Sequence, residues 1–283
     1  FDLLGLGTDA LRLIGVDENF EMDIAALKSA IAADKAAGKV PFCIVGTAGS
    51  VNVGAIDDLD AIADIALVED IWFHIDGAFG ASLMLSESMR PRLNGITRAD
   101  SLAFDFHKWW HVNYAVGFVL IRHGADHLRS FTMQAEYLAG QKRGLAAGGP
   151  WATDYGPELS RGFRALKVWT VLKEHGADKL GASISQNCEL AQYLGRKVTA
   201  APQLELCAPV ALNIVCIAYK STRADINDEI VMELQMRGIA APSTTIINGR
   251  TVIRICIANH RTTQADIDLT LAEILNIGLE MSN

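Results

Sequence analysis

The chain has 283 residues, half of them hydrophobic, which allows a substantial folded core and excludes a disordered chain. Its 33 acidic residues outnumber its 25 lysines and arginines, and the net charge of −8 gives no electrostatic reason to expect a nucleic acid or an anionic membrane as partner. No apolar run approaches the ~18 residues of a membrane-spanning helix, and the first residues lack a leader signature. We therefore expect a soluble, cytoplasmic protein with a small-molecule partner.

Apolar runs of strand length alternate with a helical pattern in the first half of the chain. Residues 40–45, 71–75 and 101–106 have the composition of buried strands, and residues 57–68 repeat apolar side chains at helical spacing behind two aspartates. Near-continuous apolar strands separated by helices are typical of a parallel sheet that is covered on both faces. The first half is therefore predicted to be α/β.

The second half begins with a glycine-rich segment that has no clear periodicity. Long segments of this kind are often functional lids, so we expect a mobile loop at about residues 137–160. We then expect a large domain over residues 1–165 and a small α+β domain over residues 166–283. The elements predicted for the small domain are helices at 163–173, 182–198, 226–236 and 264–279, and strands at 204–207, 212–219 and 252–257.

Two charged residues follow predicted strands of the sheet. Asp76 ends the second strand and Lys108 follows the third, so both are expected at the carboxyl edge, where open α/β sheets bind ligands. Lys108 lies among aromatic residues, a setting that disfavours the ammonium form and suits a nucleophilic amine. A carboxylate such as Asp76 can keep a pyridine nitrogen protonated, as an electron sink requires.

Simpler interpretations exist for each of these residues. A single aspartate at a strand end is more often a cap or turn residue, and a single lysine is more often a solvated surface group. The occurrence of both behind apolar strands, with His107 beside the lysine, favours a site.

The histidines and cysteines do not indicate a metal centre. His107/His111 and His123/His127 have i,i+4 spacing, but neither pair has an obvious third ligand nearby. The five cysteines are widely spaced and mostly lie in apolar runs, so we predict neither a zinc site nor a disulfide framework.

The sequence around these residues resembles a known family. The segments His-Ile-Asp-Gly-Ala-Phe at 74–79 and Asp-Phe-His-Lys-Trp at 105–109 are similar to the His-x-Asp-Ala-Ala-Tyr and Asn-Pro-His-Lys-Trp motifs of the group II pyridoxal-phosphate (PLP) decarboxylases, the family of aromatic-L-amino-acid decarboxylase. Flanking segments agree along nearly the whole chain, including residues 161–169.

The resemblance implies PLP-dependent fold type I and a role for each matching residue. Lys108 would attach the cofactor covalently and later transfer a proton, and Asp76 would pair with the pyridine nitrogen. Ala78 would pack beneath the ring, and His107 and Asp105 would lie near the phosphate. The loop at 46–54 resembles a Gly-Thr-x-x-x-Gly segment that approaches the cofactor.

Three features depart from the family pattern. Asp105 stands where an asparagine is common, and Val51 stands where a threonine is usual, which leaves Ser50 as the nearer hydroxyl. Tyr155 lies in a Thr-Asp-Tyr segment whose tyrosine is held to protonate the carbanion, but the stretch that follows it is shorter than in animal enzymes.

The resemblance predicts decarboxylation of an L-amino acid, aromatic by default, to an amine and CO₂, in a homodimer with its active site at the subunit interface. One alternative is a non-catalytic fragment or subunit, because the family's further amino-terminal region, with its phosphate cup, is not found here. Another is an aldehyde synthase of the same family. An aminotransferase or desulfurase would fit the Asp76/Lys108 pair but not the flanking segments.

Overall fold

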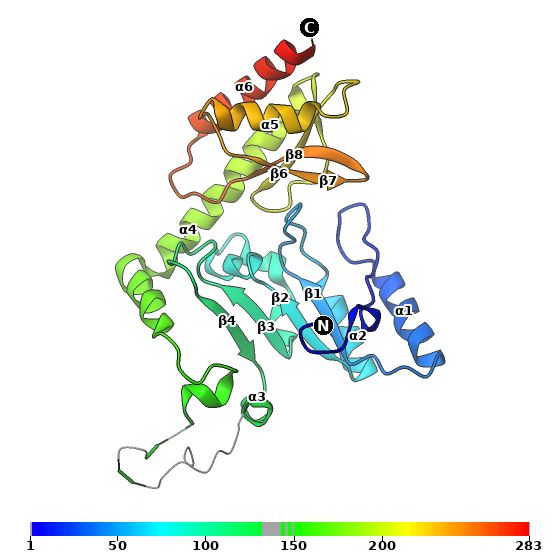
Figure 1. Ribbon diagram of the computed structural model, residues 1–283, viewed down its shortest axis with the longest axis vertical. Coiled ribbons are helices and arrows are strands. Elements are labelled where there is room, and N and C mark those ends of the chain that lie inside the picture. Colours follow the sequence, from blue (N-terminus) through cyan, green and yellow to red (C-terminus); the bar gives the residue numbers. More distant parts are fainter. Residues whose placement is uncertain (1, 132–142, 145–146, 149, 283) are drawn as a thin grey trace.

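The computed structural model describes residues 2–131, 143–144, 147–148 and 150–282. In this part of the chain the strands form two four-stranded sheets, which lie in the lower and upper halves of the molecule and are connected by the long helix α4 (Figure 1). Residues 137–142, 145–146 and 149 of the predicted mobile loop lie outside the described residues.

The first sheet has the order β1-β2-β3-β4. Strands β1 (Cys43–Thr47), β2 (Trp72–Asp76) and β3 (Ser101–Asp105) are parallel, close to the three predicted ranges. Strand β4 (Gly117–Ile121), which the sequence analysis did not predict, runs antiparallel to β3. The sheet is therefore mixed, with an antiparallel strand at one edge.

Helices α1 (Ile24–Ala36) and α2 (Leu59–Glu69) provide apolar side chains to the core of this sheet. Asp58 caps α2, since its carboxylate accepts a hydrogen bond from the N–H of Ala61 at 3.0 Å. Asp57 has another role. Its two oxygens accept from the N–H groups of Met22 and Thr47, and burial raises the pKa of this carboxyl. The strand β1 is thus tied to the chain segment that precedes α1.

Helix α4 (Arg164–Ala200) consists of two helical segments joined across a kink, in agreement with the two helices predicted for this part of the chain. Within it, Gly176 has non-helical dihedral angles, with φ of 75° and ψ of 163°, so the helix is kinked at this residue. The domain boundary predicted at residue 165 falls at the start of α4 and stays a prediction.

The second sheet has the order β5-β6-β8-β7, and all its neighbouring strands are antiparallel. Its core is formed with side chains of α4, α5 and α6, and every residue of β6 is buried. Strand β7 was not predicted. The elements are β5 (Leu204–Leu206), β6 (Ile214–Tyr219), α5 (Ile226–Met236), β7 (Ser243–Ile247), β8 (Arg250–Cys256) and α6 (Gln264–Ser282).

The connections contain short helices. Helix α3 (Gly124–Phe131) follows β4, and the 3-10 helices are η1 (Thr8–Ala10), η2 (Gly80–Leu85), η3 (Arg90–Leu93), η4 (Ile96–Arg98) and η6 (Ala152–Tyr155). Among the described residues, no helix is both long enough and apolar enough to cross a membrane.

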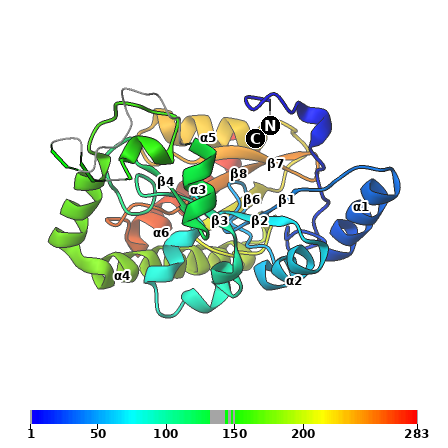
Figure 2. The same ribbon diagram turned by 90° about the horizontal axis from the view of Figure 1, so that it is seen from below.

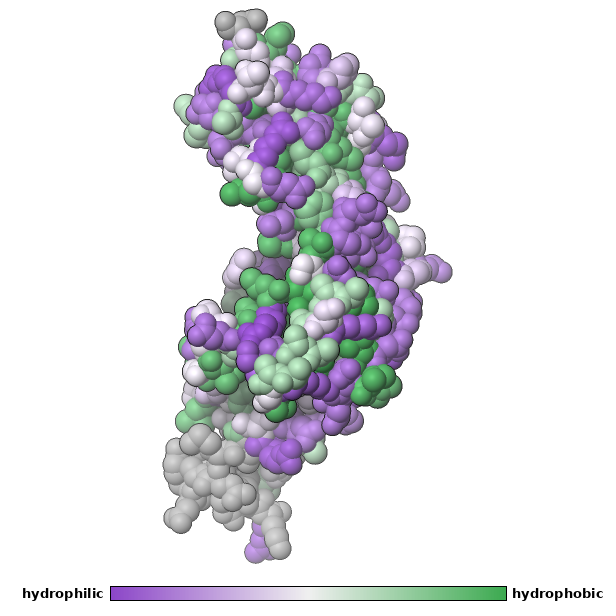
Figure 3. All heavy atoms as spheres, turned by 90° about the vertical axis from the view of Figure 1, so that its right-hand side faces the viewer, coloured by the Kyte–Doolittle hydropathy of each residue, from purple (hydrophilic) through white to green (hydrophobic). Residues whose placement is uncertain are grey.

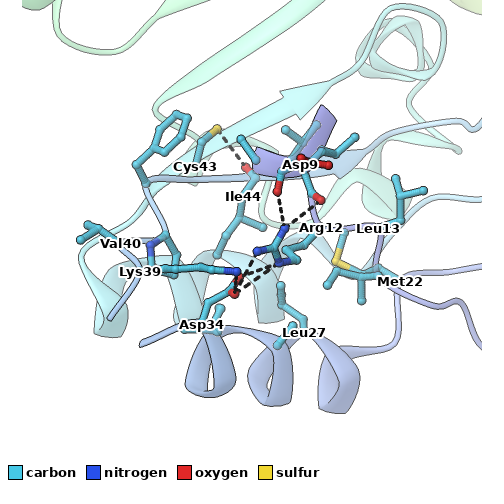
Figure 4. A pocket seen from close by; sticks show the side chains of 18 residues that line it. Asp9, Arg12, Leu13, Met22, Leu27, Asp34, Lys39, Val40, Cys43 and Ile44 are labelled. Atoms are coloured by element: carbon cyan, nitrogen blue, oxygen red, sulfur yellow. Dashed lines mark hydrogen bonds and ion pairs between the residues drawn. The ribbon is translucent and has the colours of Figure 1, made fainter. Parts of the chain in front are cut away.

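A cavity of about 710 Å³ lies at the outer edge of β1, between this strand, α1 and residues 9–14. Arg12 crosses it to reach Asp34, with 3.0 Å between Nε and Oδ2, and Lys39 approaches the same carboxylate (Figure 4). Leu13, Val40 and Phe42, which line the cavity, are exposed. Figure 3, which shows the molecule from the right-hand side of Figure 1, has green hydrophobic patches on this lower half. This cavity borders the opposite side of β1 from β2 and is separate from the site described next.

Candidate active site

The ends of the three parallel strands form one edge of the first sheet. In the register of the sheet Thr47 lies opposite Asp76, and Asp76 lies opposite Ala103. The loop after β1 also contacts the second sheet, because Arg254 of β8 donates to the carbonyl of Val51 at 2.9 Å. The edge that carries Asp76 therefore faces the second sheet, as seen for the loop that rises from β1 in Figure 1.

Asp76 is exposed at the end of β2 because side chains alternate along the strand. Phe73 and Ile75 point into the core, whereas His74 and Asp76 share the opposite face. One carboxylate oxygen of Asp76 accepts from the N–H of Ala78 at 3.1 Å, which fixes the turn. Among the residues that the structure describes, none donates a hydrogen bond to the other oxygen of this carboxylate, so it can accept one from a ligand.

His74 precedes Asp76 by two residues in β2, so its side chain lies on the same face of the sheet. Its Nδ1 is 2.7 Å from the hydroxyl of Ser101 on β3, and the indole of Trp72 donates to that hydroxyl at 2.8 Å. Burial lowers the pKa of His74, and the charge of Asp76 acts in the opposite direction. The imidazole is therefore favoured in its neutral form beneath Asp76.

Lys108 extends from the turn after β3 and pairs with Asp105. The two side chains approach to 2.8 Å between Nζ and Oδ2, and Lys108 is 39% exposed. Of the aromatic residues that neighbour it in the sequence, Phe106 and Trp110 pack edge to face against each other, with ring centroids 4.9 Å apart. The ion pair holds the lysine at the sheet edge and balances the charge of Asp105.

His107 lies in the same turn, and its side chain contacts the segment just before β4. Its Nδ1 accepts a hydrogen bond from the N–H of Val116 at 3.1 Å, so the neutral ring carries its proton on Nε2. This second nitrogen lies 4.0 Å from Oδ2 of Asp105. The imidazole thus offers an N–H donor on the side of Asp105.

Ser50 lies in the loop after β1, where its hydroxyl accepts a hydrogen bond from the N–H of Ala55 at 3.1 Å.

The loop after β1 approaches the turn after β2 very closely. The N–H of Gly80 donates to the carbonyl of Ala48, and a Cβ on Gly80 would come within 2.2 Å of that oxygen. Glycine is therefore required for the two turns to meet.

Tyr155 is not brought to this edge of the sheet. Because β4 runs back along β3, helix α3 begins at the opposite edge. The carbonyl of Tyr155 is 3.0 Å from Nε2 of His127 in α3, and the two rings are 5.0 Å apart. Figure 2, in which the molecule is seen from below, shows α3 in the foreground, in front of the first sheet. Within one chain Tyr155 and Lys108 lie at opposite edges.

The structure therefore brings Asp76, Ala78, Asp105, His107 and Lys108 to the ends of adjacent strands β2 and β3, with Ser50 in the neighbouring loop. These residues fit PLP by their donor chemistry. A carboxylate with a free oxygen suits the pyridine nitrogen, and a primary amine suits the aldehyde.

Asn187 of α4 is a further residue near the site, which the sequence motifs did not predict. Its buried amide accepts from the indole of Trp109, the residue after Lys108, at 2.9 Å. The signal that could have found it is a polar residue within an apolar stripe, since Ile184, Cys188 and Ala191 occupy the same helical face.

Comparison with known proteins identifies the family. Residues 3–220 match the model described as the pyridoxal-dependent decarboxylase conserved domain. The chain belongs to this family. The aromatic-L-amino-acid decarboxylase of Bacillus atrophaeus is 36% identical over 99% of this chain and 60% of its own length. The L-2,4-diaminobutyrate decarboxylase of Rhizobium meliloti (strain 1021) is 32% identical over 92% of this chain and 53% of its own.

Solved structures agree with this assignment. The crystal structure of Oryza sativa TDC with PLP and tryptamine superimposes with a TM-score of 0.92 at 25% identity, covering 100% of this chain and 60% of that one. The expected PLP-dependent fold type I is confirmed. The chain spans about half of the length of the curated relatives that it matches, for example 60% and 45% of the aromatic-L-amino-acid decarboxylases of Bacillus atrophaeus and Cavia porcellus.

Proposed function

We propose that this chain contributes the lysine and the pyridine-binding aspartate to PLP-dependent decarboxylation of an L-amino acid. The observation that carries the proposal is the position of Lys108 and Asp76 at the ends of adjacent strands, on the edge that faces the second sheet. PLP supplies an electron sink for the carbanion that is left when CO₂ departs.

Each residue has a task that its contacts support. Asp76 is held by the N–H of Ala78 and would direct its free oxygen to the protonated pyridine nitrogen. Lys108 would give up its ion pair with Asp105 on attaching the cofactor. His107, whose Nε2 faces Asp105, would then donate a hydrogen bond on that side and limit repulsion between Asp105 and a phosphate.

Aromatic L-amino acids are the proposed substrate class, which rests on the names of several relatives. A relative at 32% identity is named for L-2,4-diaminobutyrate, so that amino acid is the informative competitor. The test is CO₂ release from L-tryptophan, L-tyrosine and L-2,4-diaminobutyrate, with the organic product identified. An aldehyde product in place of the amine would favour the synthase reaction.

The lysine is tested by incubating the full chain with PLP, reducing with borohydride and locating the pyridoxyl group by peptide mass. We expect the adduct at Lys108, and its loss in Lys108→Ala but not in Lys167→Ala. Asp76→Asn should retain the adduct and reduce turnover by about a hundredfold or more, the usual scale for a lost electrostatic partner. A wild-type adduct elsewhere, with Lys108 unmodified, contradicts the proposal.

We further propose a homodimer in which Tyr155 of one copy serves the Lys108 of the other. The proposal is supported by the opposite positions of the two residues within one chain and by exposed apolar residues at the start of α4, namely Phe163, Leu166 and Trp169. Mixing inactive Lys108→Ala chains with Tyr155→Phe chains should restore activity, because a mixed dimer contains one intact site. If the mixture stays inactive although mixed dimers have formed, the proposal is contradicted.

A further inference from the structure

The turns that carry Asp76 and Lys108 are joined by an aromatic stack. Trp109 directly follows Lys108, and its side chain is only 2% exposed. Its ring lies against that of Phe79, with centroids 4.3 Å apart and planes inclined by 16°. Phe79 is three residues after Asp76. The position of the Trp109 indole therefore affects both turns.

The indole is fixed at its polar end by Asn187. Nε1 of Trp109 donates to Oδ1 of Asn187 at 2.9 Å, and Nδ2 of Asn187 donates to the carbonyl of Asn259 at 3.1 Å. Asn187 is 1% exposed. Leaving a buried amide unpaired is costly, so both hydrogen bonds constrain the same side chain. Asn187 thereby connects the turn after Lys108 to the segment after β8.

A second contact connects the same two segments. The rings of His111 and His260 are 5.0 Å apart, and the N–H of His111 donates to the carbonyl of Lys108 at 3.2 Å. The turn that carries the lysine thus contacts the segment after β8 on two sides, and one of these contacts passes through Asn187.

We propose that Asn187 is a positioning residue for Lys108. By holding the Trp109 indole, it fixes the turn from which the lysine extends and so sets the direction of the amine at the sheet edge. The proposal rests on the proposed role of Lys108 as the residue that binds PLP. Asn187 itself, whose amide is occupied by Trp109 and Asn259, acts through Trp109.

The test compares rates of pyridoxyl adduct formation at Lys108 in the full chain, with PLP and timed borohydride reduction. Asn187→Leu keeps the side-chain size and removes both hydrogen bonds, and it should slow the reaction by about tenfold, within the range for two lost hydrogen bonds. Trp109→Phe keeps a ring for the stack and loses the donor, so its effect should be similar. The double variant should show no further decrease, because both changes remove the same interaction.

Asn227 supplies a matched control. It is also a buried asparagine, 2% exposed, which accepts from the N–H of Tyr219 and donates to the carbonyl of Thr251 within the second sheet. Asn227→Leu should lower stability and leave the rate at Lys108 unchanged. An equal decrease in both variants, or a wild-type rate in folded Asn187→Leu, overturns the proposal.

A readout without cofactor separates this proposal from the proposed function. The indole N–H resonance of Trp109, assigned by its loss in Trp109→Phe, should shift and exchange faster with solvent in Asn187→Leu but not in Asn227→Leu. If the wild-type chain forms no adduct at Lys108, the proposed function fails. The positioning role is then tested without PLP, by comparing how fast a chemical reagent acetylates Lys108 and Lys167 in the wild type and in Asn187→Leu. An unchanged ratio in Asn187→Leu overturns the positioning role.

Discussion

The two sheets of this chain are buried to very different degrees. In the second sheet, β6 is covered along its whole length and packs against α4, α5 and α6. In the first sheet, the edge strand β4 leaves Phe118, Val119 and Leu120 between 43% and 53% exposed. Apolar burial is the main source of stability, so the second sheet should hold more of the folding free energy per strand.

The comparison is tested most strongly by matched truncations in the two sheets. Ile217 at the centre of β6 is fully buried, and Ile217→Ala should reduce the free energy of unfolding by about 2–5 kcal/mol. Leu120 on β4 is 53% exposed, and Leu120→Ala should cost no more than about 0.5 kcal/mol. Urea unfolding measures both, and equal losses would contradict the comparison.

A smaller loss of unfolding free energy is expected where α4 packs against η2, in the connection between β2 and β3. A Cβ on Gly181 would lie 2.1 Å from the carbonyl oxygen of Leu85 in η2. Gly181→Ala should therefore cost about 1–3 kcal/mol by overpacking. Gly124→Ala is the control, because a Cβ there meets nothing within 4 Å. If thermal unfolding shows no difference between the two variants, the contact between α4 and η2 is not tight.

The smallest expected effect is a dependence on pH that arises in the first sheet. Burial holds the pKa of His74 below its ordinary 6.5, so as the pH falls through 6.5 the unfolded chain takes up a proton first and is stabilised. The contribution of His74 to stability is thus complete above pH 6.5 and is lost below it. In His74→Gln the free energy of unfolding should therefore fall less steeply as the pH is lowered from 7.5 through 6.5. If the slope against pH is the same as in the wild type, His74 is not its source.

Elements with a local apolar signature could be predicted from the sequence. Strands β1, β2 and β3 are short, mostly apolar runs that form the parallel part of the first sheet, and their ends located Asp76 and Lys108. Strand β4 also has an apolar run, at residues 118–121, which was not predicted as a strand. Its antiparallel direction comes from its pairing with β3, for example Phe104 with Phe118, and β7 similarly pairs with β8.

The site residues divide in the same way. Asp76, His107 and Lys108 follow strands that the sequence reveals, so their shared location could be predicted. The position of Tyr155 depends on the direction of β4, and the partners of Asn187 are far away along the chain. Neither the direction of an edge strand nor a contact between distant segments is encoded in a local pattern.

The reversal of the chain at β4 has a consequence for mixed populations of copies. Under the proposed dimer, each site takes its lysine from one copy and its tyrosine from the other, because β4 sends the two residues to opposite edges. A copy that carries both Lys108→Ala and Tyr155→Phe would then inactivate both sites of any pair that it joins. Such a copy would act as a dominant inhibitor of wild-type chains, and its potency would rise with its share of the population.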